Sequence, residues 1–505
     1  RTTKINMLTV TEQAAKKIVV TSVPFTDTTS PVMAPGLFKG ILTTAGFDCT
    51  AIDLNGEVIN RICNDVDYAE YLRFFYYSTV TPGVELKLKE IFDYMANRLI
   101  QYNPDIICLS LLHYQCQHST MWLSFFIKKL RPDIKIVIGG AGAFGSGLTT
   151  NDNSYISMLK NQNLIDYYIS GDGDIALVEL LKGNIDYPGI NKLSWTPIED
   201  LNSIPYPNYD DYNFDIYKSP FIGVLGSRGC VRQCTFCDIH EYWEKFNWRT
   251  GENIFNEMLE QNKKYSIRYF KFQDSLINGN VKEYNKLITL LANHNKQNPD
   301  NTLNWASYFI LRPATQMSEE QWKLTAESGA FRLNVGIESL IEKNRTHIKK
   351  KFSNADIEYG LEMAKKYNIP LTFILLVGYV TETGEDHIET LKWLEEHKHY
   401  ANNPIAVLTI GGTLAILPGT WLERNQTKLG VSWNVDGQMS ATSGNNQFWE
   451  IKSTGNNYKT RVSRLDDIIK VGTSHGYNVV YSVIDPQKEL EDVINKEMAN
   501  ANYSF

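Results

Sequence analysis

Three closely spaced cysteines are the residues best suited to chemistry in this chain. In GSRGCVRQCTFCDIHEYW, residues 226–243, Cys230, Cys234 and Cys237 are followed by His240. Three thiols and an imidazole make a donor set for tetrahedral zinc. Three thiols alone can hold a [4Fe–4S] cluster and leave one iron without a protein ligand. Spacing alone leaves both interpretations open.

The surroundings of the cysteines favour the cluster. Structural zinc sites usually join ligand pairs from separate knuckles, whereas here every donor comes from one short segment that follows a strand-like run. A compact loop suits three sulfurs that must converge on one small cube. Gly229 lets the backbone approach closely, and Phe236 can shield one side from water. The other cysteines are scattered through the first quarter of the chain, and none follows Cys237.

The first two hundred residues alternate between strand-like and helix-like patterns. Continuous β-branched runs separated by helical patterns predict a parallel, doubly wound sheet with both faces covered. In such sheets ligands bind beyond the carboxyl ends of the strands. Strands are expected over 16–24, 48–55, 106–112, 134–142 and 165–174.

A second series of strand and helix patterns begins at the cysteine segment. Strands are expected over 221–226, 268–273, 303–308, 332–337, 371–377 and 405–411. Six parallel strands with intervening helices predict a partial TIM-like (βα)6 barrel, whose site lies at the carboxyl ends of its strands. The predicted fold class is therefore α/β, with a Rossmann-like domain over 1–193, a proline-containing linker over 194–219, the barrel over 220–428 and a small mixed region over 429–505 that caps it.

Composition removes several classes of protein. The 505 residues are 43% hydrophobic and 21% charged, which is ordinary for a globular protein of two or three domains. The net charge of −7 provides no overall basic character for nucleic acid or anionic membrane. No apolar run reaches the length of a bilayer span, the segment 1–17 lacks a secretory signal, and seven cysteines do not make a disulfide framework. We expect a cytoplasmic protein with neither a membrane nor a nucleic-acid partner.

The cysteine segment resembles the radical S-adenosylmethionine (SAM) superfamily, and the chain as a whole resembles its cobalamin-binding branch. The matching segments follow the order of that branch: IVIGGAG, ISGDGD, IPYPNYDDY, GSRGCVRQCTFCDIH, FKFQDSLINGN, FILRPATQMSEEQWKLTAESGAFRLNVGIES and ILLVGYVTETGED. The resemblance implies that Cys230, Cys234 and Cys237 bind a [4Fe–4S] cluster. Its open iron would chelate SAM, and one electron would cleave SAM to a 5′-deoxyadenosyl radical. His240 then becomes a bystander.

The resemblance also implies which residues contact SAM. The Phe236 backbone would lie near the adenine, and an acidic residue after the second barrel strand, here Asp274, would face the site. Polar contacts to the ribose and carboxylate would follow the third and fourth strands, and a glycine after the fifth would allow close approach; these residues are Arg312, Glu338, Ser339 and Gly378. The usual Gly-x-Pro of the family reads Gly378-Tyr379-Val380 here, without the proline.

Cobalamin is the second cofactor that the resemblance implies. The loop after the first strand, residues 22–33, contains no histidine, so cobalamin would bind without an imidazole from that loop. Glycines at strand ends would let the corrin tail contact the backbone, although a Gly-Gly pair is also ordinary turn chemistry. The expected contacts are Ser110, Leu111, Gly139, Gly140, Ala141, Gly171 and Asp172.

The implied activity is cobalamin-dependent methylation of an unactivated carbon in a small molecule or peptide, with an electron donor such as flavodoxin or ferredoxin. A radical rearrangement, cyclisation or oxidation without methylation is the alternative enzyme, and a zinc-bearing non-catalytic scaffold is the alternative outside catalysis. A methylthiotransferase is disfavoured because the scattered cysteines do not match a second cluster motif. No residue pattern assigns a catalytic acid or base, or names the substrate.

Overall fold

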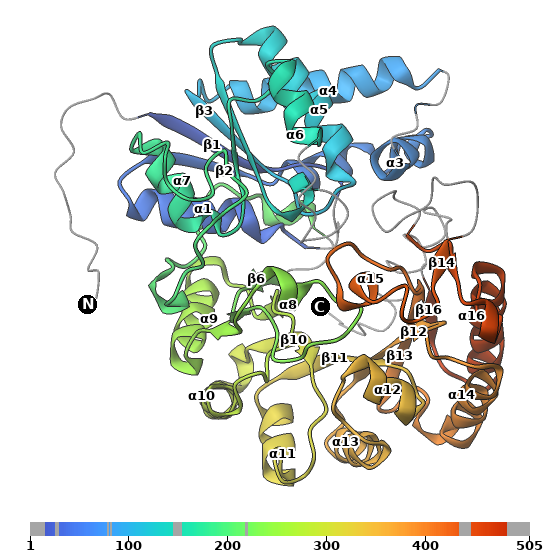
Figure 1. The fold of residues 1–505 in the computed structure, drawn as a ribbon. Helices are drawn as coiled ribbons and strands as arrows, with labels where there is room; N and C mark the ends of the chain where they lie inside the picture. Colours follow the sequence, from blue (N-terminus) through green and yellow to red (C-terminus); the bar gives the residue numbers. More distant parts are fainter. Residues whose placement is uncertain are drawn as a thin grey trace.

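Two parallel sheets organise the molecule (Figure 1). The computed structural model describes residues 16–25, 30–77, 80, 83–144, 154–217, 221–433 and 446–481. The amino-terminal sheet lies above the larger second sheet in Figure 1, and helices surround both. Among the described residues, no helix has the length and apolar character that a bilayer crossing requires.

The amino-terminal sheet has five parallel strands in the order β2-β1-β3-β4-β5. Its strands are β1 (Lys17–Ser22), β2 (Asp48–Ile52), β3 (Ile106–Ser110), β4 (Lys135–Gly139) and β5 (Tyr167–Ile169). The chain changes direction along the sheet between β1 and β3, and such a switch point is where doubly wound sheets bind ligands. The register sets Ser110 beside Ser22 on one side and Gly139 on the other. The predicted strand-end contacts of β3 and β4 therefore share one edge.

Both faces of this sheet are buried. Along β1, Ile18 and Val20 join one hydrophobic core, whereas Val19 joins the core on the opposite face. The helices that supply the rest of these cores are α1 (Met33–Thr44), α2 (Leu54–Ile62), α3 (Tyr68–Tyr77), α4 (Glu85–Ile100), α5 (Cys116–Leu130), α6 (Ser154–Asn161) and α7 (Gly173–Leu181). The prediction of a doubly wound sheet is confirmed, because only such a sheet needs apolar residues at consecutive positions.

The second sheet has seven parallel strands in the order β16-β13-β12-β11-β10-β9-β6. They are β6 (Phe221–Val224), β9 (Tyr269–Phe272), β10 (Asn304–Phe309), β11 (Ala330–Glu338), β12 (Leu371–Val377), β13 (Ile405–Thr413) and β16 (Val479–Tyr481). The first six are the predicted barrel strands. β16 is an addition that the sequence patterns do not predict, because three residues after a polar stretch carry no clear period.

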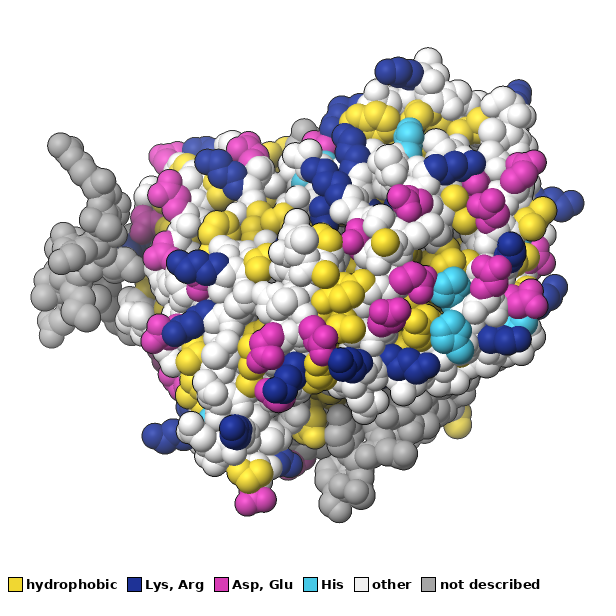
Figure 2. All heavy atoms as spheres, turned by 90° about the horizontal axis from the view of Figure 1, so that it is seen from below, with side chains coloured by type: hydrophobic (Ala, Val, Ile, Leu, Met, Phe, Trp, Pro, Cys, Tyr) yellow, Lys and Arg dark blue, Asp and Glu magenta, His cyan; other side chains and the backbone are white. Residues whose placement is uncertain are grey.

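Helices connect successive strands of the second sheet, as a βα series requires. The helices are α9 (Gly251–Tyr265), α10 (Val281–Gln297), α11 (Glu319–Glu327), α12 (Glu342–Ile348), α13 (Asn354–Lys366), α14 (Gly384–Glu396) and α16 (Tyr458–Ser474). Two short helices, α8 (Ile239–Tyr242) and α15 (Trp421–Arg424), lie in loops. Seen from below, acidic and basic side chains are interspersed over the described residues of this face (Figure 2). That distribution offers no single-sign stripe for a polynucleotide on this side.

The predicted linker is a packed strap between the two sheets. The Tyr212 hydroxyl donates to the Val32 carbonyl at 2.8 Å, and the Tyr217 hydroxyl donates to the Asp53 carboxylate at 2.5 Å. Tyr209 is 1% exposed and belongs to the core of the second sheet. The strap therefore holds the amino-terminal domain by hydrogen bonds and the barrel by apolar packing.

Candidate active site

The three cysteines lie in a loop whose neck is closed by a small antiparallel ribbon. After β6 ends, β7 (Ser227–Arg228) pairs with β8 (Asn247–Trp248), so residues 229–246 form a loop on the carboxyl end of β6. Gly229 has φ +80°, and a Cβ there would lie 2.8 Å from the Lys245 carbonyl oxygen. Only glycine fits this neck, which explains its position directly before Cys230.

The loop rests on an apolar base. Cys234 is 6% exposed and packs with Ile348, Tyr379 and Trp449, which come from three distant parts of the chain. Cys230 and Cys237 are half-buried, and all three thiols are free of disulfides. The base places the cysteines at the carboxyl end of the second sheet, as predicted.

Tyr379 anchors the loop at the position where the family has the middle residue of Gly-x-Pro. Its hydroxyl lies 2.6 Å from the Thr235 hydroxyl and 2.8 Å from His347 Nδ1, and its side chain is 1% exposed. The Thr235 amide also donates to the Ile348 carbonyl, and the Thr235 carbonyl accepts from the Leu422 amide. A hydrogen-bonding phenol thus fixes the loop where the proline is missing, and no local pattern in the sequence points to it.

The donor set fits a cluster better than a single zinc ion. Among the described residues, no three Cys, His, Asp or Glu side chains are close enough to enclose one metal ion. His240 Nε2 lies 3.0 Å from Glu241, and its buried Nδ1 has no hydrogen-bond partner among the described residues. Cluster ligands bind separate corners of a cube and need not converge on one point. Burial raises the pKa of each thiol, that of Cys237 to about 12, so thiolates here need the positive charge that iron supplies.

Two guanidinium groups beside the cysteines leave buried donors open. Within the described part of the chain, Nε of Arg232 and Nε of Arg312 are buried and have no hydrogen-bond partner. Arg312 donates its other nitrogens to the Asn278 carbonyl at 2.7 Å and to Gln316 at 2.9 Å. Burial lowers the pKa of Arg312, and the nearby charge of Arg232 lowers it further. Two neighbouring cations with unused donors suit a carboxylate, and Arg312 was predicted for such a role.

Glu338 lies where the prediction places it, but it has a partner that the sequence did not indicate. Glu338 is the last residue of β11, and its backbone lies in the left-handed region at φ +63°. This conformation is uncommon for residues other than glycine and is often found at functional sites. The Glu338 carboxylate is 2.9 Å from Lys350 Nζ, and both side chains are largely buried. Lys350 also lowers the pKa of the Cys230 and Cys234 thiols against the larger effect of burial. The buried pair therefore borders the cysteine loop.

Ser339 and Asp274 have structural partners in this structure. The Ser339 carbonyl accepts from Arg345 at 2.8 Å, and its hydroxyl accepts from the Ile341 amide at 3.2 Å. The Asp274 carboxylate accepts from the Gly226 amide at 2.8 Å and from the Ser227 hydroxyl. Asp274 thus holds the strand that enters the cysteine loop. The proposed contacts of both residues with SAM stay predictions.

Asp274 makes folding stability depend on pH. Burial raises the pKa of this carboxyl to about 7, despite the two hydrogen bonds that favour its charged form. An unfolded aspartate titrates near pH ~3.9, so between these values the folded state binds the extra proton. The contribution of Asp274 to folding stability is therefore fully present below about pH 3.9 and is lost as pH rises to about 7. In the native protein this group should lower the free energy of unfolding by about 3 kcal/mol between about pH 5 and pH 8. We expect Asp274→Asn to lack this decrease, as measured by urea unfolding across that pH range. An equal decline in the variant would contradict this assignment.

Gly378 is a site of close approach, but the approaching group is Arg461. Gly378 has φ +76°, and a Cβ there would lie 2.2 Å from Arg461 Cδ. The Gly378 amide donates to Glu382 at 3.0 Å, and its carbonyl accepts from Asn456. Residues of the carboxyl-terminal region therefore occupy the space beside this glycine. The predicted contact between Gly378 and SAM is not tested by this arrangement.

Five of the predicted cobalamin contacts lie together at the carboxyl edge of the first sheet. The Leu111 amide donates to the Gly139 carbonyl at 2.8 Å, and the Ser110 carbonyl accepts from the Val23 amide at 3.2 Å. Gly140 has φ +95° and packs on the Leu111 carbonyl, with Ala141 next in the chain. Shortly after β3, Leu112 is 58% exposed and Tyr114 50% exposed. Exposed apolar side chains at the point where the strand order reverses suit contact with a large, flat ligand.

The remaining two predicted contacts, Gly171 and Asp172, pack against the linker and the start of the barrel. A Cβ on Gly171 would lie 2.0 Å from the Trp195 ring. Asp172 is 7% exposed, and its carboxylate accepts from the Ile198 amide and from Arg228. Gly171 and Asp172 therefore lie against the linker and the start of the barrel, and their predicted contacts with cobalamin stay predictions. The loop after β1 is described only in part, since residues 26–29 lie outside the described residues.

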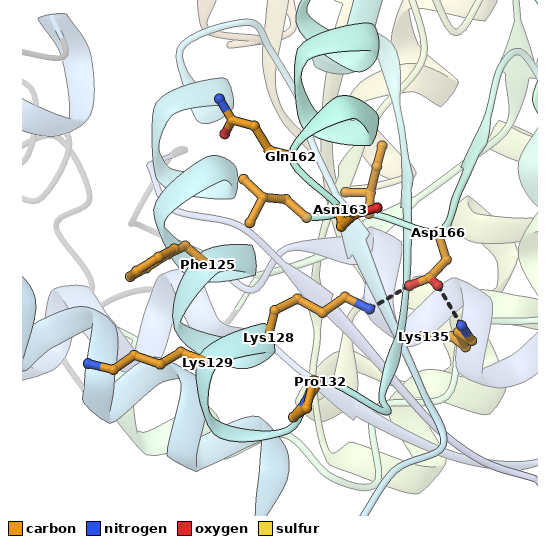
Figure 3. A pocket seen from close by; sticks show the side chains of 10 residues that line it. Phe125, Lys128, Lys129, Pro132, Lys135, Gln162, Asn163 and Asp166 are labelled. Carbon is orange, nitrogen blue, oxygen red and sulfur yellow. Dashed lines mark hydrogen bonds and ion pairs between the residues drawn. The ribbon is translucent and has the colours of Figure 1, made fainter.

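A surface cavity of about 580 Å³ lies at the other end of the first sheet (Figure 3). Lys135 begins β4 and Asp166 directly precedes β5, so the cavity adjoins the amino ends of these strands. Asp166 lies between Lys128 at 2.7 Å and Lys135 at 2.8 Å and offsets their charge. This cavity is not part of the candidate active site.

Comparison with known proteins assigns the cysteine loop to a family. Residues 224–394 match the radical SAM superfamily. The segment that carries the cysteine loop therefore contains a radical SAM domain. The chain is an enzyme, and the radical SAM match begins at the last residue of β6 and extends into α14.

Two relatives are named methyltransferases and a third is a cyclase. An uncharacterized methyltransferase, PH0819, of Pyrococcus horikoshii is 23% identical over 60% of this chain and 67% of its own length. Cytidylyl-2-hydroxyethylphosphonate methyltransferase of Streptomyces wedmorensis is 24% identical over 51% of this chain and 54% of its own. The anaerobic magnesium-protoporphyrin IX monomethyl ester cyclase of a Synechocystis species is 20% identical over 54% of this chain and 55% of its own. The chain thus spans about half the length of the last two.

Two solved structures share the fold across both sheets. The radical SAM methyltransferase TsrM of Kitasatospora setae, with cobalamin and a [4Fe–4S] cluster bound, aligns with a TM-score of 0.65 at 14% identity. That alignment covers 94% of this chain and 92% of TsrM. The cobalamin-dependent radical SAM enzyme OxsB, with aqua-cobalamin bound, aligns with a TM-score of 0.65 at 14% identity over 96% of this chain and 72% of OxsB. At these identities the likeness shows the fold.

Proposed function

We propose that this radical SAM enzyme is a cobalamin-dependent methyltransferase that acts on an unactivated carbon. The proposal rests on a contact between the two sheets at their carboxyl ends. Arg228, at the neck of the cysteine loop, donates a hydrogen bond to Asp172, which follows β5. A strand-end ligand of the first sheet would therefore lie near the cysteine loop. The shared fold with cobalamin-bound TsrM and OxsB and the two relatives named methyltransferases support this reading.

The side chains of the site have distinct proposed tasks. Cys230, Cys234 and Cys237 would hold the cluster, and the open donors of Arg232 and Arg312 would bind the carboxylate of SAM. When bound, the cluster supplies the electron that cleaves SAM, and cobalamin carries the methyl group. The barrel residues orient SAM, while the carboxyl-terminal region limits access of water to the cysteine base.

Glu338 and Phe236 would complete the SAM site. Lys350 holds the Glu338 carboxylate in place, and the carboxylate oxygens could accept hydrogen bonds from ribose hydroxyls. Phe236 is half-buried beside Cys237, and its backbone would lie near the adenine. For cobalamin, the edge formed by residues 110–111 and 139–141 and the exposed side chains of Leu112 and Tyr114 is the proposed contact surface.

The substrate is proposed to be a small molecule or peptide. A second TsrM structure has its tryptophan substrate and a SAM analogue bound, which supports a substrate of this size class but not this identity. The acidic net charge of −7 disfavours a polynucleotide. A reduced flavodoxin or ferredoxin is the proposed electron donor.

Anaerobic reconstitution with isotope tracing tests the proposal. The protein is loaded with iron, sulfide and hydroxocobalamin, reduced, and incubated with SAM that carries a deuterated methyl group and with a panel of aromatic amino acids and peptides. We expect bound iron and cobalamin, 5′-deoxyadenosine, and a deuterated methyl group in one product. Formation of 5′-deoxyadenosine with an altered but unmethylated substrate would support a rearrangement, cyclisation or oxidation instead. A colourless protein with one zinc ion would contradict both.

A further inference from the structure

A buried ion cluster joins the two domains beside the cysteine loop. We propose that Arg228, Asp172 and Asp174, here called the interdomain clamp, fix the position of the cysteine loop relative to the carboxyl edge of the first sheet. Arg228 is a positioning residue in this proposal, which rests on the proposed function because that edge is the proposed cobalamin surface.

The clamp has the geometry of a strong, directional contact. Arg228 Nη1 lies 2.6 Å from one Asp172 oxygen, and its two terminal nitrogens each lie 3.0 Å from an oxygen of Asp174. The side chains of Arg228, Asp172 and Asp174 are 12%, 3% and 6% exposed. The second Asp172 oxygen accepts from the Ile198 amide of the linker at 3.0 Å. A planar guanidinium that pairs both its ends in this way fixes orientation as well as distance.

Aromatic rings enclose the clamp. Trp195 of the linker stacks on Tyr242 at 5.2 Å and meets Trp243 edge-on at 5.2 Å. The Arg228 guanidinium lies 5.7 Å from the Trp243 ring centroid. Gly171 leaves no room for a Cβ beneath Trp195, so the rings and the β5 loop are in direct contact. Exclusion of water strengthens the charge interactions of the clamp.

The position of the clamp gives it a task beyond stability. Arg228 pairs with Asn247 in the ribbon at the neck of the loop, two residues before Cys230. Asp172 and Asp174 flank the start of α7, directly beyond β5. Buried ion clusters are expensive to desolvate and often stabilise no more than apolar residues would, but they fix register. A reaction between groups held on two domains needs the domains in a fixed relative position, because a displacement of a reacting group by about 1 Å can lower the rate about a hundredfold.

A distance measurement tests the clamp without knowledge of the substrate. Cys63 is an exposed, free cysteine of the first domain, whereas Cys49, Cys108 and Cys116 are buried. After the cluster has been assembled, Cys63 is labelled with a reduction-resistant spin label. Pulsed electron paramagnetic resonance then gives the distribution of distances between the label and the reduced cluster. We expect a narrow distribution for the native clamp.

Substitutions of the clamp should broaden this distribution. Arg228→Met and Asp174→Asn are expected to widen it by about twofold or more, because the directional contact between the domains is lost. Arg228→Lys keeps the charge but lacks the planar fork, so an intermediate width is expected. Arg73→Met, at an exposed position of α3 in the first domain, is the control and should keep the native width.

The outcomes separate this inference from the proposed function. Iron and cobalamin contents are measured on every sample. An unchanged width in Asp174→Asn, which lies outside the cysteine loop and retains its iron, would overturn the clamp. Absence of bound cobalamin in the native protein would instead contradict the proposed function, while the label-to-cluster distances would still decide the role of the clamp.

Discussion

Cys234→Ala is expected to abolish 5′-deoxyadenosine formation from SAM. Cys234 is the most buried of the three cysteines and packs on the base formed by Ile348, Tyr379 and Trp449. Without this thiolate the cluster keeps only two protein ligands. The rate of 5′-deoxyadenosine formation should therefore fall by about a hundredfold or more, which is more than the ten- to hundredfold typical when a residue that only supports a metal ligand is replaced. The measurements are iron content and the rate of 5′-deoxyadenosine production under anaerobic reduction.

Cys63→Ala is the matched control for this prediction. Cys63 is exposed at the end of α2, far along the chain from the cysteine loop. Its removal should leave iron content and 5′-deoxyadenosine production unchanged. Full activity in Cys234→Ala would show that the three-thiol interpretation is wrong, whereas equal losses in both variants would indicate damage that is not specific to the cluster.

Arg461→Met is expected to lower the free energy of unfolding by about 2–4 kcal/mol. Arg461 is fully buried, and burial lowers its pKa to about 10. Its guanidinium lies 3.8 Å from the Trp449 ring centroid and donates to the carbonyls of Gln447 at 2.6 Å and Trp449 at 2.9 Å. Methionine keeps the stem that packs on Gly378 but leaves these buried carbonyls without a donor.

Urea unfolding measures this effect, and Arg73→Met provides the comparison. The Arg73 side chain is 58% exposed and forms a surface ion pair with Glu70. Its replacement should therefore change the free energy of unfolding by about 0.5 kcal/mol or less. A similarly small change in Arg461→Met would contradict the view that the carboxyl-terminal region is built onto β12 through this residue. Because the same region borders the cysteine base, we also expect faster loss of iron to a chelator in Arg461→Met.

Much of the fold could be predicted because its signals are local. The runs at 106–112 and 134–142 are apolar at consecutive positions, which requires a sheet covered on both faces, and the structure has that sheet. β16 escaped prediction because its three residues have no period of their own and are held in place by pairing with β13. A strand of that length exists only through its neighbour.

The candidate site divides in the same way. The three thiols could be recognised as a ligand set from the sequence, because Cys230, Cys234 and Cys237 lie in one short segment and their spacing does not depend on the rest of the fold. Their surroundings could be read only from the folded chain. Tyr379 reaches Thr235 and Lys350 reaches Glu338 across different strands, and Asp172 meets Arg228 across two domains. Such pairs follow from the packing of distant segments, and nothing in the pattern around either partner encodes them.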